Sequence, residues 1–282
     1  MAAQPSPEMV ARLQAEVIAE NGGESRVDAN FELDESCCSR YLRARGLDHA
    51  KAKKMLQATI TWRKDFGVER LVEDHFETLE HECATGKFFI SPFLDNDGRP
   101  IVVMRNRLEN SKSHEGNVLN LVYQLERASA ATRAAGVEKW AIIIDMDGYS
   151  MSNAPPLKTS RATLSIMQDH YPERMHRCFM LDAPWLFSGM WSALSPFIDP
   201  VTRDKICFVS GPMKEGSERA KLLAESFPLS SLEESIGGTA AWTFSAETYL
   251  KDDRARYEAA KAAGSKVEAA AESPANAEGI GA

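Results

Sequence analysis

The sequence predicts an α/β protein in which a mostly parallel sheet follows a small bundle of helices. Two observations lead to this fold class. The first 85 residues read as helices only, because apolar residues recur at helical spacing between capping residues and glycines. After Gly86, short apolar runs alternate with helical segments. Strand–helix–strand connections of this length place parallel strands side by side through right-handed crossovers.

Each expected helix of the N-terminal bundle starts after a capping residue and ends near a glycine. Ser6 precedes Pro7, a combination favoured at a first turn, and Asp34 and Asp48 precede the two later helices. The expected helices span residues 7–21, 35–45 and 49–66. Short loops between them predict antiparallel packing.

Alternating strands and helices make up the rest of the expected domain. Asn96-Asp97-Gly98 is a hairpin-type turn between the first two strands, and Pro92 and Pro100 restrict those strands to a sheet edge or a strand start. The expected strands are 88–95, 99–106, 140–145, 178–181 and 205–211, and the expected helices are 117–136, 157–170 and 184–198. After about residue 245 the chain is rich in Ala and Glu, which predicts a frayed helix running into disorder.

Composition and charge indicate a soluble protein of the cytoplasm. With 282 residues, 44% of them hydrophobic, the chain can bury a large core, and its net charge of −8 argues against general nucleic-acid binding. The five cysteines form no C-x-x-C pair, so we expect neither a disulfide framework nor a metal site. No apolar run reaches the roughly 18–20 residues that cross a bilayer. We expect a monomer.

Familiar enzyme motifs are missing from the sequence. It contains no G-x-S-x-G nucleophile elbow, no G-x-x-x-x-G-K-[ST] phosphate loop and no G-x-G-x-x-G. We therefore expect no catalytic residues. The alternative is an α/β enzyme that uses Asp145, Asp147 and Lys205 on a small anionic substrate, because the two aspartates follow a buried strand.

Three segments carry the strongest functional signals. Residues 184–198, PWLFSGMWSALSPFI, hold an apolar stripe at helical spacing and no charge. Such a helix fits either a buried core position or the wall of an apolar cavity that meets a membrane interface. In DPVTRDKI a lysine follows a threonine at the start of an apolar strand, where it suits a solvated strand end or a phosphate. In YPERM a glutamate and an arginine follow a proline, which alone fits an ion-paired turn.

Taken together, these segments resemble the CRAL-TRIO family. YLRARGLDHAKAKKMLQATITWRKDFGVERL is similar to the family's N-terminal helical part, and DNDGRPIVV, IIIDMDGYS, YPERM, APWLFSGMWSALSPFIDPVTRDKI and SIGG follow its order over about residues 34–245. YPERM followed by PFIDPVT and KI is similar to the phosphatidylinositol-transfer branch. The resemblance implies a CRAL-TRIO fold, with a sheet floor, flanking helices and a mobile gate helix around one lipid.

The resemblance also implies a division of the chain and two sets of site residues. The expected parts are an N-terminal extension (1–33), a helical segment (34–85), the lipid-binding domain (86–245) and a tail (246–282). The residues expected to bind the lipid head group are Glu173, Lys205, Thr202, Arg43, Arg45 and Arg174. Those expected on the gate helix and in the acyl cavity are Trp185, Phe187, Met190, Trp191, Leu194, Phe197 and Ile198.

The function that the resemblance implies is extraction of phosphatidylinositol at cytosolic membrane faces and its exchange for a second apolar ligand. Trp140 and Ile142 stand where relatives present hydroxyl side chains toward phosphatidylcholine, so the second ligand is not clearly phosphatidylcholine, and a sterol or isoprenoid is an alternative. Haem held by Tyr171, His170 or Tyr149 is another alternative. We expect a bound phospholipid and no cofactor. The expected partners are membrane surfaces, through transient peripheral contact, and phosphoinositide kinases.

A basic cluster interrupts the acidic sequence near the N-terminus. It is expected to be a solvated helix face or a surface that steers the protein to anionic leaflets. Its members are Arg40, Arg43, Arg45, Lys51, Lys53, Lys54, Arg63 and Lys64.

Overall fold

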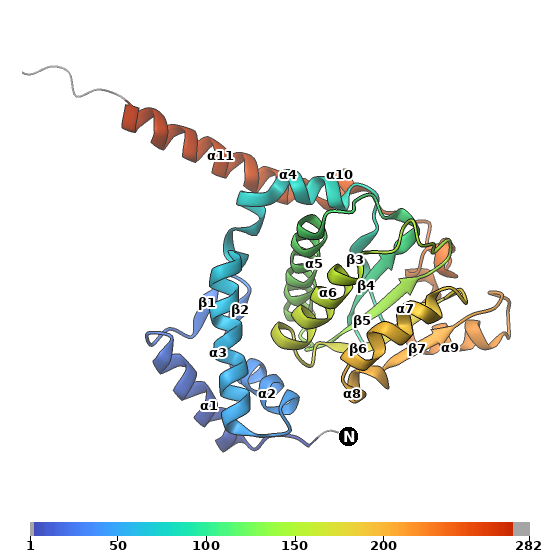
Figure 1. Ribbon diagram of the computed structural model, residues 1–282, viewed down its shortest axis with the longest axis horizontal. Helices are drawn as coiled ribbons and strands as arrows, with labels where there is room; N and C mark the ends of the chain where they lie inside the picture. The colour runs from blue at the N-terminus through green and yellow to red at the C-terminus, as the bar shows by residue number, and fades with distance from the viewer. Residues whose placement is uncertain (1–2, 273–282) are drawn as a thin grey trace, which may run out of the picture.

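A five-stranded sheet lies at the centre of the computed structural model, which describes residues 3–272 (Figure 1). The strands are β3 (Phe88–Leu94), β4 (Pro100–Arg105), β5 (Trp140–Asp145), β6 (Met175–Leu181) and β7 (Ile206–Val209), and their order in space follows the chain. β3 pairs antiparallel with β4, and the remaining neighbours are parallel. The predicted α/β class with a mostly parallel sheet is confirmed.

The connecting helices lie on one face of this sheet. Each parallel strand pairs with the next one along the chain, and right-handed crossovers then place successive connections on the same side. These helices are α5 (His114–Ala134), α6 (Leu157–His170) and α7 (Phe187–Leu194), and the short α8 (Pro200–Arg203) leads into β7. The opposite face packs against α9 (Glu218–Ser226) and the chain that follows it.

Side chains of the central strands alternate between two apolar cores. Val102 and Ile142 pack in the core beneath the connecting helices. Their neighbours Val103 and Ile143 point to the other side, where they pack with Phe227. Period-two alternation therefore buries both faces, as parallel strands require.

Three helices share one apolar core in the N-terminal part. They are α1 (Pro7–Glu20), α2 (Glu35–Ala44) and α3 (His49–Phe66), and each has its predicted capping residue. The expectation that the first 85 residues hold only helices is wrong, because β1 (Arg26–Asp28) and β2 (Phe31–Glu32) form a short antiparallel hairpin. These strands are too short to show alternation in the sequence. Since α1 packs in the same core as α2 and α3, we propose that residues 1–33 belong to this helical unit.

The C-terminal helix packs on the helix that precedes the sheet domain. The helix α11 (Lys251–Glu272) follows α10 (Ala246–Tyr249) and lies along α4 (Leu71–Cys83) (Figure 1). Tyr257 stacks on Phe76 with ring centroids 5.0 Å apart, and the Tyr249 hydroxyl accepts a hydrogen bond from the backbone N–H of Ile90 at 3.0 Å. The expected tail thus begins as a docked helix, and the expected disorder of residues 273–282 lies outside the described residues.

The apolar helix of the third crossover is shorter than predicted. It ends at Leu194 and a 3₁₀ turn, η3 (Ser195–Phe197), follows, because Pro196 has no N–H with which to continue the α-helical hydrogen bonds. Trp185 lies before the helix, in a turn that starts at Asp182, whose φ is 53°. Within residues 3–272, no helix combines the length and apolar character needed to cross a membrane.

Arg63 of α3 is a buried cation that joins the N-terminal helices to the sheet domain. Its side chain is 2% exposed and contacts the carboxylates of Asp28 at 2.5 Å and Glu126 of α5 at 2.8 Å. Glu126 also accepts a hydrogen bond from the Tyr171 hydroxyl at 2.6 Å. Burial opposes the charge, but the neighbouring carboxylates raise the pKa of Arg63 above its ordinary value. The guanidinium therefore stays charged between two partners.

We predict that Arg63→Leu lowers the free energy of unfolding by about 3–5 kcal/mol, because it leaves two buried carboxylates without their cation. Urea denaturation measures this loss. The matched control is Lys64→Leu, one position along α3, which removes only an exposed contact to Asn21 and should cost within about 0.5 kcal/mol. Equal stability of the two variants would contradict the role given to Arg63.

Candidate functional site

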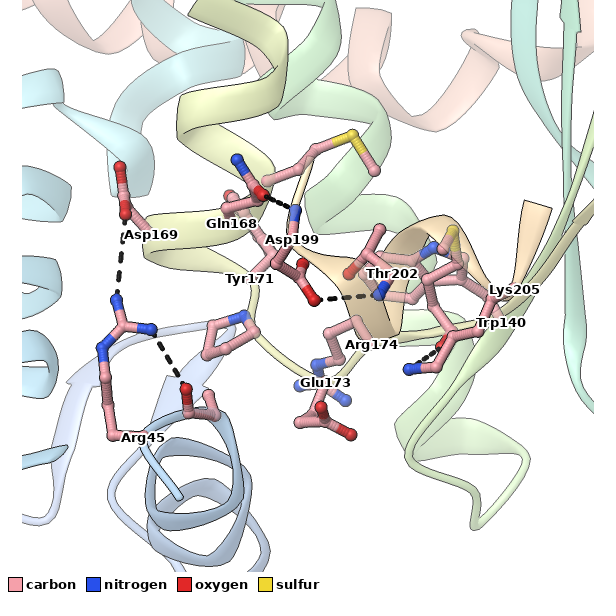
Figure 2. Close-up of a pocket in the computed structure, with 14 residues that line it drawn as sticks. Arg45, Trp140, Gln168, Asp169, Tyr171, Glu173, Arg174, Asp199, Thr202 and Lys205 are labelled. Carbon is pink, nitrogen blue, oxygen red and sulfur yellow. Dashed lines mark hydrogen bonds and ion pairs between the residues drawn. The ribbon is translucent and has the colours of Figure 1, made fainter. Parts of the chain in front are cut away.

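A polar cavity of about 340 Å³ lies at the amino ends of β5, β6 and β7 (Figure 2). The end of α2, the last turn of α6, the turn before β6 and α8 complete its wall. The lining residues are Ala44, Arg45, Trp140, Met167, Gln168, Asp169, Tyr171, Pro172, Glu173, Arg174, Met175, Asp199, Thr202 and Lys205. Five of the six predicted head-group residues therefore meet in one place.

Glu173 and Lys205 provide opposite charges to this cavity. Glu173 sits in the turn between α6 and β6 with a φ of 59°, and its carboxylate lies 3.5 Å from the Lys139 ammonium. Lys205 directly precedes β7, and its ammonium lies 3.5 Å from the backbone carbonyl of Met175. Thr202 lies one helical turn before Lys205, where Asp199 caps α8. The three residues thus come from segments that the strand ends hold together.

The arginines differ in how they are held. Burial, and then the nearby charge of Arg40, lowers the pKa of Arg174 to about 10, and its guanidinium donates to the backbone carbonyl of Glu138 at 3.0 Å. Arg45 reaches toward Asp169 at 4.0 Å (Figure 2). Arg43 does not line the cavity, because its guanidinium pairs with the Glu138 carboxylate at 2.7 Å. Three cations, Arg45, Arg174 and Lys205, therefore line the cavity together with three carboxylates, Asp169, Glu173 and Asp199, and Arg43 lies outside the lining.

An apolar cavity of about 210 Å³ lies between the sheet, α6 and α7. Five of the predicted gate residues line it, namely Phe187, Met190, Trp191, Leu194 and Ile198. Trp185 and Phe197 do not line it and are 85% and 49% exposed. α7 runs back over the sheet, from the carboxyl end of β6 toward the polar cavity.

The two cavities adjoin, because neighbouring residues of the same segments line both. Asp199 and Lys205 line the polar cavity, whereas Ile198 and Ile206 line the apolar one. On α6, Met167 lines the polar cavity, and Leu164, one turn earlier, lines the apolar cavity. A molecule with an anionic, hydroxylated head and an apolar body suits this arrangement, since each part meets groups of its own polarity.

Gln168 ties the end of the gate segment to α6. Its side-chain amide donates to the carbonyl of Phe197 at 2.9 Å. The same side chain accepts from the N–H of Asp199 at 3.1 Å (Figure 2). These bonds hold the backbone on both sides of Ile198. Gln168 was not expected from the sequence, because a glutamine at a helix end carries no recognisable signal.

Two sequence interpretations do not agree with the structure. Asp145 lies at the carboxyl end of β5, where Arg107 pairs with it, whereas Lys205 lies at the opposite end of the strands, so the alternative enzyme site is not assembled. The basic cluster is not a continuous solvated face, because Arg40 and Arg63 are buried. Packing between α2, α3 and the sheet domain encloses them.

Two of the three residues considered as haem ligands, Tyr171 and His170, contact other side chains of the protein. The Tyr171 hydroxyl donates to Glu126, and His170 Nδ1 lies 3.1 Å from the Thr59 hydroxyl. The His170 ring also stacks on Trp62 with centroids 4.0 Å apart. Tyr149 lines the apolar cavity. Within residues 3–272 no group of three or more His, Cys, Asp or Glu side chains is placed to hold a metal ion.

The chain is similar to several known proteins. Residues 84–238 match the model of the CRAL/TRIO domain. The phosphatidylinositol transfer protein PDR17 of Saccharomyces cerevisiae is 36% identical over 187 residues, which cover 63% of this chain and 53% of PDR17. The SEC14 cytosolic factor of Kluyveromyces lactis is 34% identical over 223 residues, covering 73% and 71%. The crystal structure of Sfh5 matches with a TM-score of 0.55 at 13% identity, over 73% of this chain and 82% of that one, which shows a shared fold.

We predict that His170 makes the protein less stable as the pH falls from about 6.5 to about 4. Burial lowers the pKa of His170 to about 4, so the unfolded chain binds a proton in this window that the folded protein does not. Urea denaturation at several pH values should show that His170→Gln loses less stability over the window than the wild type. His81→Gln, at an exposed position of α4, is the control and should follow the wild type. Identical pH profiles for His170→Gln and the wild type would contradict the prediction.

Proposed function

Since the chain belongs to the CRAL/TRIO domain family, we propose that it is a lipid-transfer protein that takes phosphatidylinositol from cytosolic membrane faces. The observation that carries this proposal is the junction of a charged cavity with an apolar one along the same segments. The name of the relative PDR17 as a phosphatidylinositol transfer protein supports it. The protein acts in this proposal as a carrier, without chemical change of the lipid.

The polar cavity offers suitable partners for an inositol phosphate head group. A phosphodiester removed from water needs cations and donors, which Lys205, Arg45 and Arg174 supply, with the Thr202 hydroxyl beside them. Inositol hydroxyls need an acceptor, and the Glu173 carboxylate is available on the same wall. The acyl chains then extend beneath α7.

The second ligand is proposed to be an apolar molecule other than phosphatidylcholine. Trp140 lines the polar cavity at the start of β5 and Ile142 is buried two positions along the strand, and neither side chain has a hydroxyl. The indole N–H of Trp140, which has no hydrogen-bond partner within residues 3–272, is the one side-chain donor that these two residues offer to a choline phosphate head. This strand therefore favours a ligand with little polar surface.

Membrane contact is proposed to occur through apolar side chains around the gate segment. Trp185, Phe197, Val201 and Phe208 are about half exposed or more. Trp185 lies before α7 and Phe197 after it. Val201 lies in α8, and Phe208 lies on the edge strand β7. Aromatic residues favour the interface of a bilayer, so these positions suit transient peripheral binding.

We predict that Lys205→Ala and Glu173→Ala each reduce phosphatidylinositol transfer between vesicles by about tenfold or more, because a buried phosphate or hydroxyl loses its partner. The free energy of unfolding should change by no more than about 0.5 kcal/mol. Lys158→Ala, on the exposed side of α6 and outside the cavity lining, is the control and should transfer normally. Loss of fold in parallel with loss of transfer would refute these assignments.

We also predict that Gln168→Met releases the gate segment. The substitution keeps the size of the side chain but removes both hydrogen bonds that hold residues 197 and 199. A fluorescent probe on the exposed Ser188 should then change its emission without vesicles, whereas the wild type should require them. Ser165→Ala, one turn earlier on α6, is the control and should behave as the wild type. Vesicle-dependent emission in Gln168→Met would show that the gate is held elsewhere.

A further inference from the structure

Tyr149 carries a buried hydroxyl that has no hydrogen-bond partner within residues 3–272. The residue is 7% exposed and lines the apolar cavity. We propose that this hydroxyl donates a hydrogen bond to an oxygen of the second ligand, so that Tyr149 selects apolar molecules bearing one oxygen acceptor over pure hydrocarbons. The inference rests on the proposed function and deepens it by naming the ligand class and the residue that recognises it.

The turn after β5 fixes the position of Tyr149. The N–H of Met146 donates to the carbonyl of Leu181 at 2.9 Å, and the N–H of Tyr149 donates to the carbonyl of Met146 at 3.0 Å. Gly148 permits this turn with a φ of 68°. The Tyr149 ring meets Phe187 of α7 edge to face, with centroids 5.6 Å apart. Backbone and ring contacts thus hold the side chain at the start of the gate helix.

A phenol hydroxyl without a hydrogen-bond partner makes the wall of an apolar cavity less stable. A buried hydroxyl without a partner costs about 1–3 kcal/mol relative to a satisfied one, and phenylalanine would fill the same space without that cost. Burial also raises the pKa of Tyr149, which keeps the hydroxyl protonated and able to donate. The missing acceptor is therefore assigned to the ligand.

The position of Tyr149 separates this acceptor from the phospholipid head group. The polar cavity lies at the amino end of β5, and Tyr149 follows its carboxyl end. Six strand residues span about 17–20 Å, whereas the ester oxygens of a phospholipid stay close to its phosphate. A phospholipid bound through Lys205 would bring only hydrocarbon to Tyr149. The acceptor thus belongs to a different ligand, which places its oxygen at the far end.

Three other polar side chains, Asn106, Ser160 and Thr163, line the same cavity, and Asn106 lies beside the Met146 side chain. The Asn106 side-chain amide donates to the Met146 thioether at 3.3 Å, a weak acceptor, and Asn106 also borders the cavity. A ligand hydroxyl that accepts from Tyr149 would have its own proton free for an amide oxygen. Alcohols are therefore favoured over ketones among the molecules that this wall can hold.

The experiment compares matched ligands that differ only in the oxygen. Purified protein is incubated with phosphatidylcholine vesicles containing cholesterol or the corresponding hydrocarbon 5-cholestene, or geranylgeraniol or its hydrocarbon, and bound molecules are measured by mass spectrometry. The wild type should take up the alcohol of at least one pair in preference, and Tyr149→Phe should reduce that preference by about fivefold to tenfold. Phosphatidylinositol transfer by the wild type is measured in parallel.

The stability of the ligand-free protein is an independent measurement, in which Tyr149→Phe should have a favourable effect although it weakens ligand selection. Tyr149→Phe should raise the melting temperature, because it removes an unsatisfied hydroxyl. Tyr249→Phe is the matched control and should lower it, since the Tyr249 hydroxyl bonds both Ile90 N–H and the Gln124 side chain. No alcohol preference in the wild type, or an unchanged preference in Tyr149→Phe, overturns the inference. If phosphatidylinositol transfer is also absent from the wild type, the proposed function fails with it.

Discussion

The buried pairing of Arg63 with Asp28 and Glu126 is the constraint on which the rest of the arrangement depends. The Arg63 guanidinium contacts both the β1–β2 hairpin and α5. Its partner on α5, Glu126, also accepts a hydrogen bond from the Tyr171 hydroxyl. Tyr171 is part of the polar cavity wall. The N-terminal helices therefore do more than cover the sheet, because their position relative to α5 fixes the turn that presents Glu173.

The path of the chain explains why polar and apolar groups separate so cleanly. β6 leads away from the polar cavity, and α7 returns to it along the same face. Every crossover begins at the carboxyl end of one strand and ends at the amino end of the next. Charged residues such as Lys205 and Glu173 lie just before strands, where the backbone is accessible, and apolar residues follow within the strands. A single amphipathic cavity system results from this order without any long insertion.

Sequence patterns were sufficient for the parts of the fold that depend on local chemistry. Ser6, Asp34 and Asp48 cap helices because their side chains accept backbone N–H groups, and that property is visible in the sequence. The burial of Arg40 and Arg63 was not predictable, since it arises from packing between segments distant in the chain. The family resemblance identified five of the 14 residues that line the polar cavity and five of the 17 that line the apolar cavity. It did not identify Gln168, and it named Tyr149 only as one of three alternative haem ligands, because the hydrogen-bond partners that these two residues have or lack are not visible in the sequence.

The docking of α11 on α4 affects what counts as an independent folding unit. The family match covers residues 84–238, yet Tyr249 bonds the backbone of β3, and Tyr257 stacks on Phe76 before the matched region. A fragment cut to the matched boundaries would lack α4 and α11, and it would expose the edge strand β3 and the apolar side of α5 that packs on α4. The segments on the two sides of the matched region therefore pack on each other and on the sheet domain. Local opening of α11 would uncover α4, so amide exchange in α4 and α11 should report a single cooperative unit.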